Sequence, residues 1–194
     1  MARRRWKCFA VYSKKGYQKK RSRSHRREYV SGGADPNITI FDSGNRKRQD
    51  WEIRMGLMLE RNRNISHFTL EAMRRNINKG LIKRIGRANF HLKVRQHPHT
   101  VYREHAMMSF AGADRLSSGM RNAFGNPVGR CARVKAGQII LEIDGLFKNF
   151  DRIVAALKNA SYKLGAKSQI VLLKTSTEEI DGKINYPRLS DYKD

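Results

Sequence analysis

Residues 90–134 read FHLKVRQHPHTVYREHAMMSFAGADRLSSGMRNAFGNPVGRCARV, and this stretch decides how the fold is organised. Strand-like runs at both ends enclose a long segment of Ala, Gly, Ser and Met. In the first run, residues 90–95, apolar and polar side chains alternate, which is the period of a strand with one buried face. The polar side chains are His91, Lys93 and Arg95, and such a row is suited to contact phosphates.

The enclosed segment, residues 105–129, is longer than most connections and is therefore expected to be a functional loop. Asp114 is its only acid, whereas Arg115 and Arg121 can bind phosphates in a bidentate manner or stack on bases. Catalysis needs a convergent acid, base and nucleophile, and the sequence offers no such group. We therefore predict that the chain is not an enzyme and has no catalytic residue, cofactor or small-molecule substrate.

The rest of the chain adds strands and helices around this stretch. Further strands are predicted at residues 37–41, 51–59, 100–104, 130–135, 138–143 and 169–173, and helices at 66–84 and 148–163. Ser66 can cap the first helix, and Gly165 can end the second. The pattern predicts an α+β fold with two helices packed on a mixed, largely antiparallel sheet.

Three regions follow from this reading. The α+β domain spans residues 35–173 and contains the internal loop 105–129. A basic arm, residues 1–34, precedes it. A polar tail, residues 174–194, follows it and is expected to trail away from the domain.

The charge of the chain indicates a polyanionic partner. Its 41 Lys and Arg residues outnumber 17 Asp and Glu residues, for a formal net charge of +24. Nucleic acid is the first candidate. An anionic membrane is the alternative, but the sequence shows neither a basic helix with a broad apolar face nor an apolar run of the ~20 residues that span a bilayer. No apolar segment follows the first charges, so we expect neither a secretory signal nor membrane association.

The arm concentrates this charge. Aromatic residues are interleaved with its cations, a composition typical of a segment that folds onto RNA. A nuclear localisation patch is a compatible alternative. The predicted RNA-binding cations of the arm are Arg3, Arg4, Arg5, Lys7, Lys14, Lys15, Lys19, Lys20, Arg21, Arg23, Arg26 and Arg27.

A metal site is not expected. His97 and His99, followed later in the chain by Cys131, are residue types that bind zinc. Structural zinc sites need paired cysteines, however, and the two cysteines of this chain are far apart in sequence. Isolated cysteines of this kind are usually small buried hydrophobes in a reducing compartment. The imidazoles are better suited to stack on RNA bases or to bond to them.

Several motifs in residues 90–134 resemble one family. AGADR (residues 111–115), GMRNAFG (119–125), FHLKVR followed by His97-Pro98, and GRCARV (129–134) are similar to the universal large-subunit ribosomal protein called L-sixteen in bacteria and L-ten-e in archaea and eukaryotes, with Cys131 favouring a eukaryotic-type member. A weaker resemblance extends over most of residues 1–173. It departs in the arm before Asp35, where the usual prolines are missing, and in the tail after Lys174.

The resemblance implies a structural constituent of the large ribosomal subunit in the cytoplasm, with ribosomal RNA, tRNA, neighbouring ribosomal proteins and late assembly factors as partners. It implies a place near the peptidyl transferase centre and the A-site tRNA, and a loop that supports tRNA placement and late subunit maturation. That loop comprises Met108, Ser109, Phe110, Ala111, Gly112, Ala113, Asp114, Arg115, Leu116, Ser117, Ser118, Gly119, Met120 and Arg121. Predicted RNA contacts outside the arm and the loop are His91, Lys93, Arg95, His97, His99, Arg103, Arg130 and Arg133.

Two other functions remain as alternatives. A free basic regulator that binds RNA or DNA would need a recognition module, such as a helix-turn-helix or aromatic RNP strands, and the sequence shows neither. An RNA-modifying enzyme would need a catalytic cluster, which is missing as well.

Overall fold

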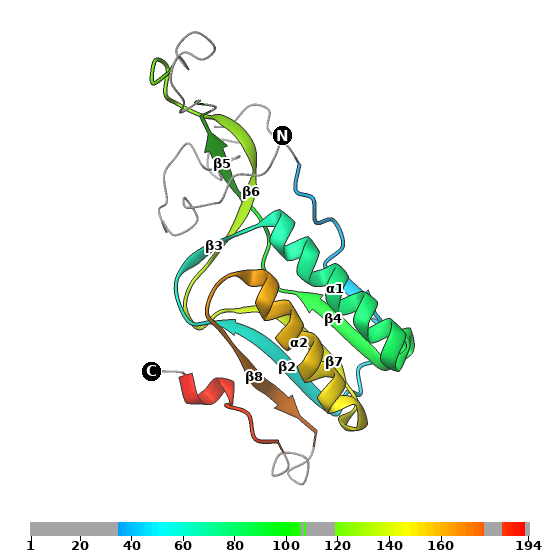
Figure 1. Ribbon diagram of the computed structural model, residues 1–194. Helices are drawn as coiled ribbons and strands as arrows, with labels where there is room; N and C mark the ends of the chain where they lie inside the picture. The colour runs from blue at the N-terminus through cyan, green and yellow to red at the C-terminus, as the bar shows by residue number, and fades with distance from the viewer. Residues whose placement is uncertain (1–34, 106, 108–118, 177–183, 193–194) are drawn as a thin grey trace, which may run out of the picture.

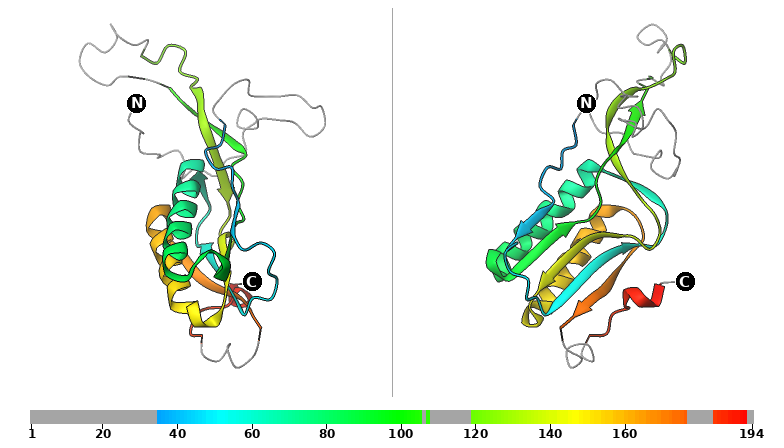
Figure 2. Two further views of the ribbon diagram at one scale, coloured as in Figure 1. Left: turned by 90° about the vertical axis from the view of Figure 1, so that its right-hand side faces the viewer. Right: turned by 180° about the vertical axis from the view of Figure 1, so that it is seen from behind.

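A computed structural model describes residues 35–105, 107, 119–176 and 184–192 of the chain. Two antiparallel helices cover one face of a five-stranded sheet, and a separate two-stranded ribbon rises from the top of this body (Figure 1). Seen edge-on, both helices lie on the same side of the sheet (Figure 2). The apolar sides of the helices and the sheet meet in one core, which is the two-layer arrangement of an α+β domain.

The larger sheet has the strand order β1-β4-β7-β2-β8, and every neighbouring pair is antiparallel. Its strands are β1 (Asp42–Gly44), β2 (Ile53–Leu59), β4 (Phe90–Val94), β7 (Ile139–Gly145) and β8 (Ser168–Thr175). The predicted alternation in β4 is confirmed, because Phe90, Leu92 and Val94 are buried against the helices.

A smaller sheet has the order β3-β6-β5 and is also antiparallel. It is formed by β3 (Arg63–Ser66), β5 (Thr100–Glu104) and β6 (Asn126–Val134). We call β5 together with β6 the ribbon. The predicted α+β class is therefore confirmed, although the strands form two sheets where the sequence suggested one.

The two helices begin and end near the predicted residues. The helix α1 (His67–Ile85) is capped by the Ser66 hydroxyl, which accepts from the Thr69 backbone N–H at 3.2 Å. The helix α2 (Phe150–Leu164) ends at Gly165, whose φ of 63° is left-handed. Short 3₁₀ turns lie at η3 (Arg87–Asn89), η5 (Phe147–Asn149) and η6 (Leu189–Tyr192). Within the described residues, neither helix combines the length and the apolar character that crossing a bilayer requires.

Three strand boundaries differ from the prediction. The expected strand at 37–41 is not a strand; the pairing with β4 begins only at Asp42, where Gly44 brings its backbone close to the Phe90 carbonyl. The strand β3 was missed because RNIS has no apolar alternation, and it is fixed by pairing with β6. The ribbon strand β6 begins at Asn126, so the loop ends earlier than the predicted residue 129.

The described part of the tail packs against the domain, which corrects the expectation that the tail trails away. The backbone N–H of Leu172 in β8 donates to the Pro187 carbonyl at 2.9 Å. Ile184 is buried, and the Tyr186 ring meets the Phe150 ring edge-on at 5.9 Å. Figure 1 shows η6 beside β8 at the edge of the sheet. The tail has few apolar residues in a polar sequence, so the contacts of Ile184 and Tyr186 could not be recognised from the sequence without the rest of the fold.

Candidate nucleic-acid interface

The base of the internal loop is held by two side chains of the ribbon. Arg103 Nη1 donates to the Gly125 carbonyl at 3.0 Å, and its guanidinium lies 4.5 Å from the centre of the Phe124 ring. His105 Nε2 donates to the Gly119 carbonyl at 2.6 Å. Both ends of the loop are therefore tied to the end of β5, which is the end of the ribbon farthest from the sheet (Figure 1).

Most of the predicted loop, residues 108–118, lies outside the described residues, as do all the predicted cations of the arm. Of the predicted loop residues, Gly119, Met120 and Arg121 are described. Met120 is 67% exposed, and Arg121 is also exposed beside it. The segment that leads from the loop back to β6 thus exposes a cation, Arg121, and an apolar side chain, Met120.

The ribbon needs a glycine at position 125. A Cβ there would lie 2.6–2.9 Å from backbone atoms of Glu104, which cannot move aside without separating the strands. We expect Gly125→Ala to open the ribbon by about 1–3 kcal/mol, so that amide hydrogen exchange in residues 100–104 and 126–134 accelerates roughly 5- to 100-fold. The matched control is Gly80→Ala in α1, where a Cβ meets nothing within 4 Å. Equal exchange rates in the two variants would contradict the prediction.

The other predicted cations of the ribbon are partly occupied within the protein. Arg130 Nη2 donates to Asp35 Oδ1 at 2.8 Å, and the Arg130 side chain is only 15% exposed. Asp35 directly follows the arm in sequence, so this ion pair joins the start of the domain to the ribbon. Arg133 is half-buried next to the β3 pairing. Arg130 therefore helps to hold the ribbon against the start of the domain.

The predicted cationic row on β4 faces outward, but carboxylates of β7 compensate most of it. His91 Nδ1 lies 3.3 Å from Asp144 Oδ2, and Arg95 Nε donates to Glu142 Oε2 at 2.9 Å. Arg54 of β2 also binds Asp144, and this hydrogen bond raises the pKa of the Arg54 guanidinium. Both carboxylates are only 3% exposed. That the three side chains of this row contact RNA stays a prediction, and the structure adds that His91 and Arg95 already have carboxylate partners.

The reason lies in the register between the strands. His91 is directly opposite Asp144, and Lys93 is opposite Glu142. Residues opposite each other in a sheet share a face, so ion pairs form across the strands. Alternation within residues 90–95 shows which side chains share a face, but it cannot show what the neighbouring strand places beside them.

The two predicted histidines form a short aromatic stack at the edge of the domain. The His97 ring stacks on Phe41 with centroids 4.0 Å apart, and the His99 ring follows at 5.8 Å with nearly parallel planes. Both imidazoles are exposed. An unpaired base could extend such a stack, since base–aromatic stacking tolerates any base.

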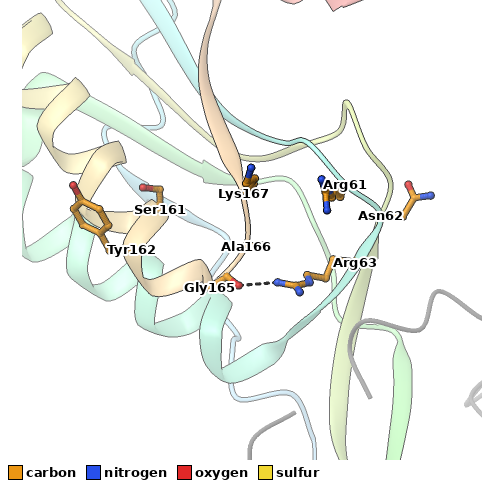
Figure 3. Close-up of a pocket in the computed structure, with 8 residues that line it drawn as sticks. All are labelled: Arg61, Asn62, Arg63, Ser161, Tyr162, Gly165, Ala166 and Lys167. Carbon is orange, nitrogen blue, oxygen red and sulfur yellow. Dashed lines mark hydrogen bonds between the residues drawn. The ribbon is translucent and has the colours of Figure 1, made fainter. Parts of the chain in front are cut away.

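A basic pocket that the sequence reading missed lies where α2 meets β8. Arg61 lines it from the β2–β3 connection, Arg63 from the first position of β3, and Lys167 from the residue before β8 (Figure 3). Arg63 Nη1 donates to the Gly165 carbonyl at 2.7 Å, and Tyr162 at its margin is 72% exposed. Three cations and no carboxylate are among its described lining residues. The run RNRN after an apolar strand was the available signal.

Metal chemistry finds no support in the described part of the chain, where no three His, Cys, Asp or Glu side chains are grouped closely enough to hold an ion. Cys131 is buried, as expected for a small hydrophobe. The described surface therefore offers what phosphate binding needs: exposed cations, stacking rings and a loop on a fixed base.

Comparison with known proteins identifies a family whose model matches most of the chain. The family model described as "Ribosomal protein L16p/L10e" matches residues 15–171. This range includes both helices, the complete internal loop and every strand except the end of β8. The match agrees with the resemblance seen in the motifs of residues 90–134.

Individual relatives are similar over most of their length. The chain is 45% identical over 152 residues to the large ribosomal subunit protein uL16 of Picrophilus torridus, covering 78% of this chain and 85% of that protein. It is 40% identical over 171 residues to the same-named protein of Methanoculleus marisnigri, covering 88% and 96%. It is 38% identical over 174 residues to that of Pinus taeda, covering 89% and 73%. These relatives carry the name of a ribosomal protein and not of an enzyme.

Proposed function

Because the chain belongs to the ribosomal protein L16p/L10e family, whose members are structural constituents of the large ribosomal subunit, we propose that it binds ribosomal RNA near the peptidyl transferase centre and the A-site tRNA. Its internal loop supports tRNA placement and late maturation of the subunit. It resides in cytoplasmic ribosomes, with ribosomal RNA and neighbouring ribosomal proteins as partners. The loop additionally meets tRNA and late assembly factors.

One observation supports this proposed role of the loop. The described start and return of the loop are joined at the far end of the ribbon, where Arg103 donates to the Gly125 carbonyl and His105 to the Gly119 carbonyl. A loop held in this way can deliver a few side chains to a distant RNA site without losing much conformational entropy on binding. In this proposal the ribbon supports the loop, and the side chains of the loop contact RNA.

The mechanism is electrostatic. Cations of the arm neutralise phosphates and release counterions, which makes binding dependent on salt. Contacts to phosphates fix the register of the protein on RNA and carry no sequence information. The RNA performs peptide transfer, and the protein positions its substrates.

Sucrose-gradient sedimentation of lysate at low and high salt tests the assignment. We expect the chain to comigrate with large subunits and full ribosomes and to resist moderate salt. Migration at the top of the gradient would contradict the proposal and favour a free basic regulator.

The loop arginines separate incorporation from function. We expect Arg115→Ala combined with Arg121→Ala to leave the protein incorporated, because the arm and the domain remain intact. Translation or late maturation should be impaired, visible as fewer polysomes and more free subunits. The matched control is Lys135→Ala with Lys174→Ala, which removes two exposed cations away from the loop. Normal polysome profiles in the loop variant would refute this role.

A further inference from the structure

A second group of cations lies at the end of the domain opposite to the ribbon. There the last turn of α1 meets the first turn of α2, and a pocket between them is lined by Arg84, Lys148, Asn149 and Arg152. Figure 1 shows this end of the helix pair at the bottom of the molecule, far from β5 and β6. None of these residues belongs to the loop, the ribbon or the arm.

Asn149 is the unusual member of this group. It is only 5% exposed and occupies the cap position of α2, yet its side chain makes no capping hydrogen bond. Within the described residues, its Nδ2 atom has no hydrogen-bond partner. Buried amide donors are nearly always satisfied, so a donor left over in a pocket indicates an acceptor supplied from outside.

The surroundings favour an acceptor with negative charge. The pocket lies at the N-terminus of α2, where the helix dipole attracts anions. Arg152 Nη1 donates to the Arg84 carbonyl at 2.9 Å, which fixes one guanidinium at the pocket. Asp151 is the acid of the first turn and is exposed, so three cations oppose one carboxylate here.

The pocket continues into a second one along the crevice between the helices. Arg84 lines both, and Lys79 and Lys83 line the second together with Asn76 and Asn159. Gly80 lies at this second pocket with open space where a side chain would stand. Five cations and several amides therefore follow one groove. This arrangement fits an extended polyanion better than a single small anion.

We propose that this groove between α1 and α2, the helix groove, binds the phosphate backbone of a second ribosomal RNA segment, with one phosphate at Asn149 Nδ2. The inference rests on the proposed ribosomal function and adds a separate site to it. Since the ribbon and the helix groove lie at opposite ends of the domain, the protein bridges two RNA segments (Figure 1). Under this proposal, ribosomal RNA contacts the domain at two opposite ends.

The first test is Asn149→Asp, examined in the full-length chain with protein-free large-subunit ribosomal RNA. The new carboxylate would lie among Arg84, Lys148 and Arg152 at the N-terminus of α2, where negative charge is favourable, so we expect the variant to fold, and its Tm checks this. A phosphate at this position would be repelled by the new carboxylate. We expect RNA affinity to fall about tenfold or more at physiological salt. Unchanged affinity in a folded variant would overturn the proposal.

The second test compares two variants of equal charge. Arg84→Ala with Lys148→Ala removes two cations of the helix groove, and Lys158→Ala with Lys163→Ala removes two exposed cations of α2 that do not line it. The groove variant should lower the slope of log affinity against log salt by about one unit per lost phosphate contact. Equal slopes in the two variants would mean that RNA affinity depends on the net charge and not on the helix groove, and this would refute the proposal.

Footprinting distinguishes this site from the proposed function. In the groove variant, hydroxyl-radical protection should be lost over one RNA segment and kept elsewhere. If the wild-type chain binds the RNA and both groove tests show no effect, the helix groove is refuted and the ribosomal function stands. If the wild-type chain does not bind, both proposals are refuted.

Discussion

Deletion of residues 1–27 is expected to prevent stable incorporation of the chain into large subunits. The deleted segment holds twelve Lys and Arg residues between positions 3 and 27 and no acid within that range. If half of these cations contact phosphates, the salt slope of RNA binding falls by about 4 to 5 units. At physiological salt this corresponds to a loss of several orders of magnitude in affinity. Occupancy on purified subunits, measured over a series of salt concentrations, checks the result.

A shuffled arm is the matched control. A variant with residues 1–27 rearranged but unchanged in composition keeps the charge and the aromatic content. If counterion release dominates, the shuffled arm restores most of the affinity and the full salt slope. Full occupancy of the deleted chain at moderate salt would refute the role of the arm. Failure of the shuffled arm alone would show that specific contacts, and not charge, secure it.

Replacement of Glu71 by Gln is expected to destabilise the fold strongly, because it breaks a buried ion pair. Glu71 Oε2 and Oε1 accept from Arg74 Nε and Nη2 at 2.8 and 2.7 Å, and both side chains are buried. Arg74 also reaches Ser43 of β1 at 3.4 Å, so the pair links helix to sheet edge. Removing one partner of a buried pair costs about 3–5 kcal/mol, a large part of the ~5–15 kcal/mol that holds a domain folded.

The effect should depend on pH in a defined direction. Hydrogen bonds from Arg74 and then Arg75 lower the pKa of Glu71 below its ordinary 4.5, against the opposing effect of burial. A depressed carboxyl pKa stabilises the fold above the unfolded pKa, and this contribution is lost as pH falls through the folded pKa. The difference in unfolding free energy between wild type and Glu71→Gln should therefore be full at neutral pH and shrink below pH 4.5.

Chemical denaturation at several pH values measures this difference. The matched control is Glu60→Gln, which changes an exposed carboxylate and should stay within about 0.5 kcal/mol of wild type. A Glu71 variant as stable as the control would show that Arg74 finds another acceptor or escapes to solvent.

Local patterns predicted the elements well where one residue's environment is set by its near neighbours. The stripe Leu70, Met73, Ile77 and Leu81 indicated the buried face of α1, and all four side chains are buried. The cap at Ser66 and the stop at Gly165 depend on hydrogen bonds and dihedral angles within one turn, so residue type was sufficient. β3 has no such local signal, and only the partner strand defines it.

The candidate site divides in the same way. Sequence alone determined the excess of positive charge, the basic arm, the loop with its arginines and the family motifs, because these are properties of residue type and order. Only the tertiary structure decided which cations remain available. It placed carboxylates of β7 beside His91 and Arg95, and it paired Arg130 with Asp35. It also brought Arg84 of α1 to Lys148 and Arg152, which are distant from it in sequence, around a buried Asn149. The physical reason is that the local field on a charge depends on neighbours in space, and strand register and helix packing bring those neighbours from remote parts of the chain.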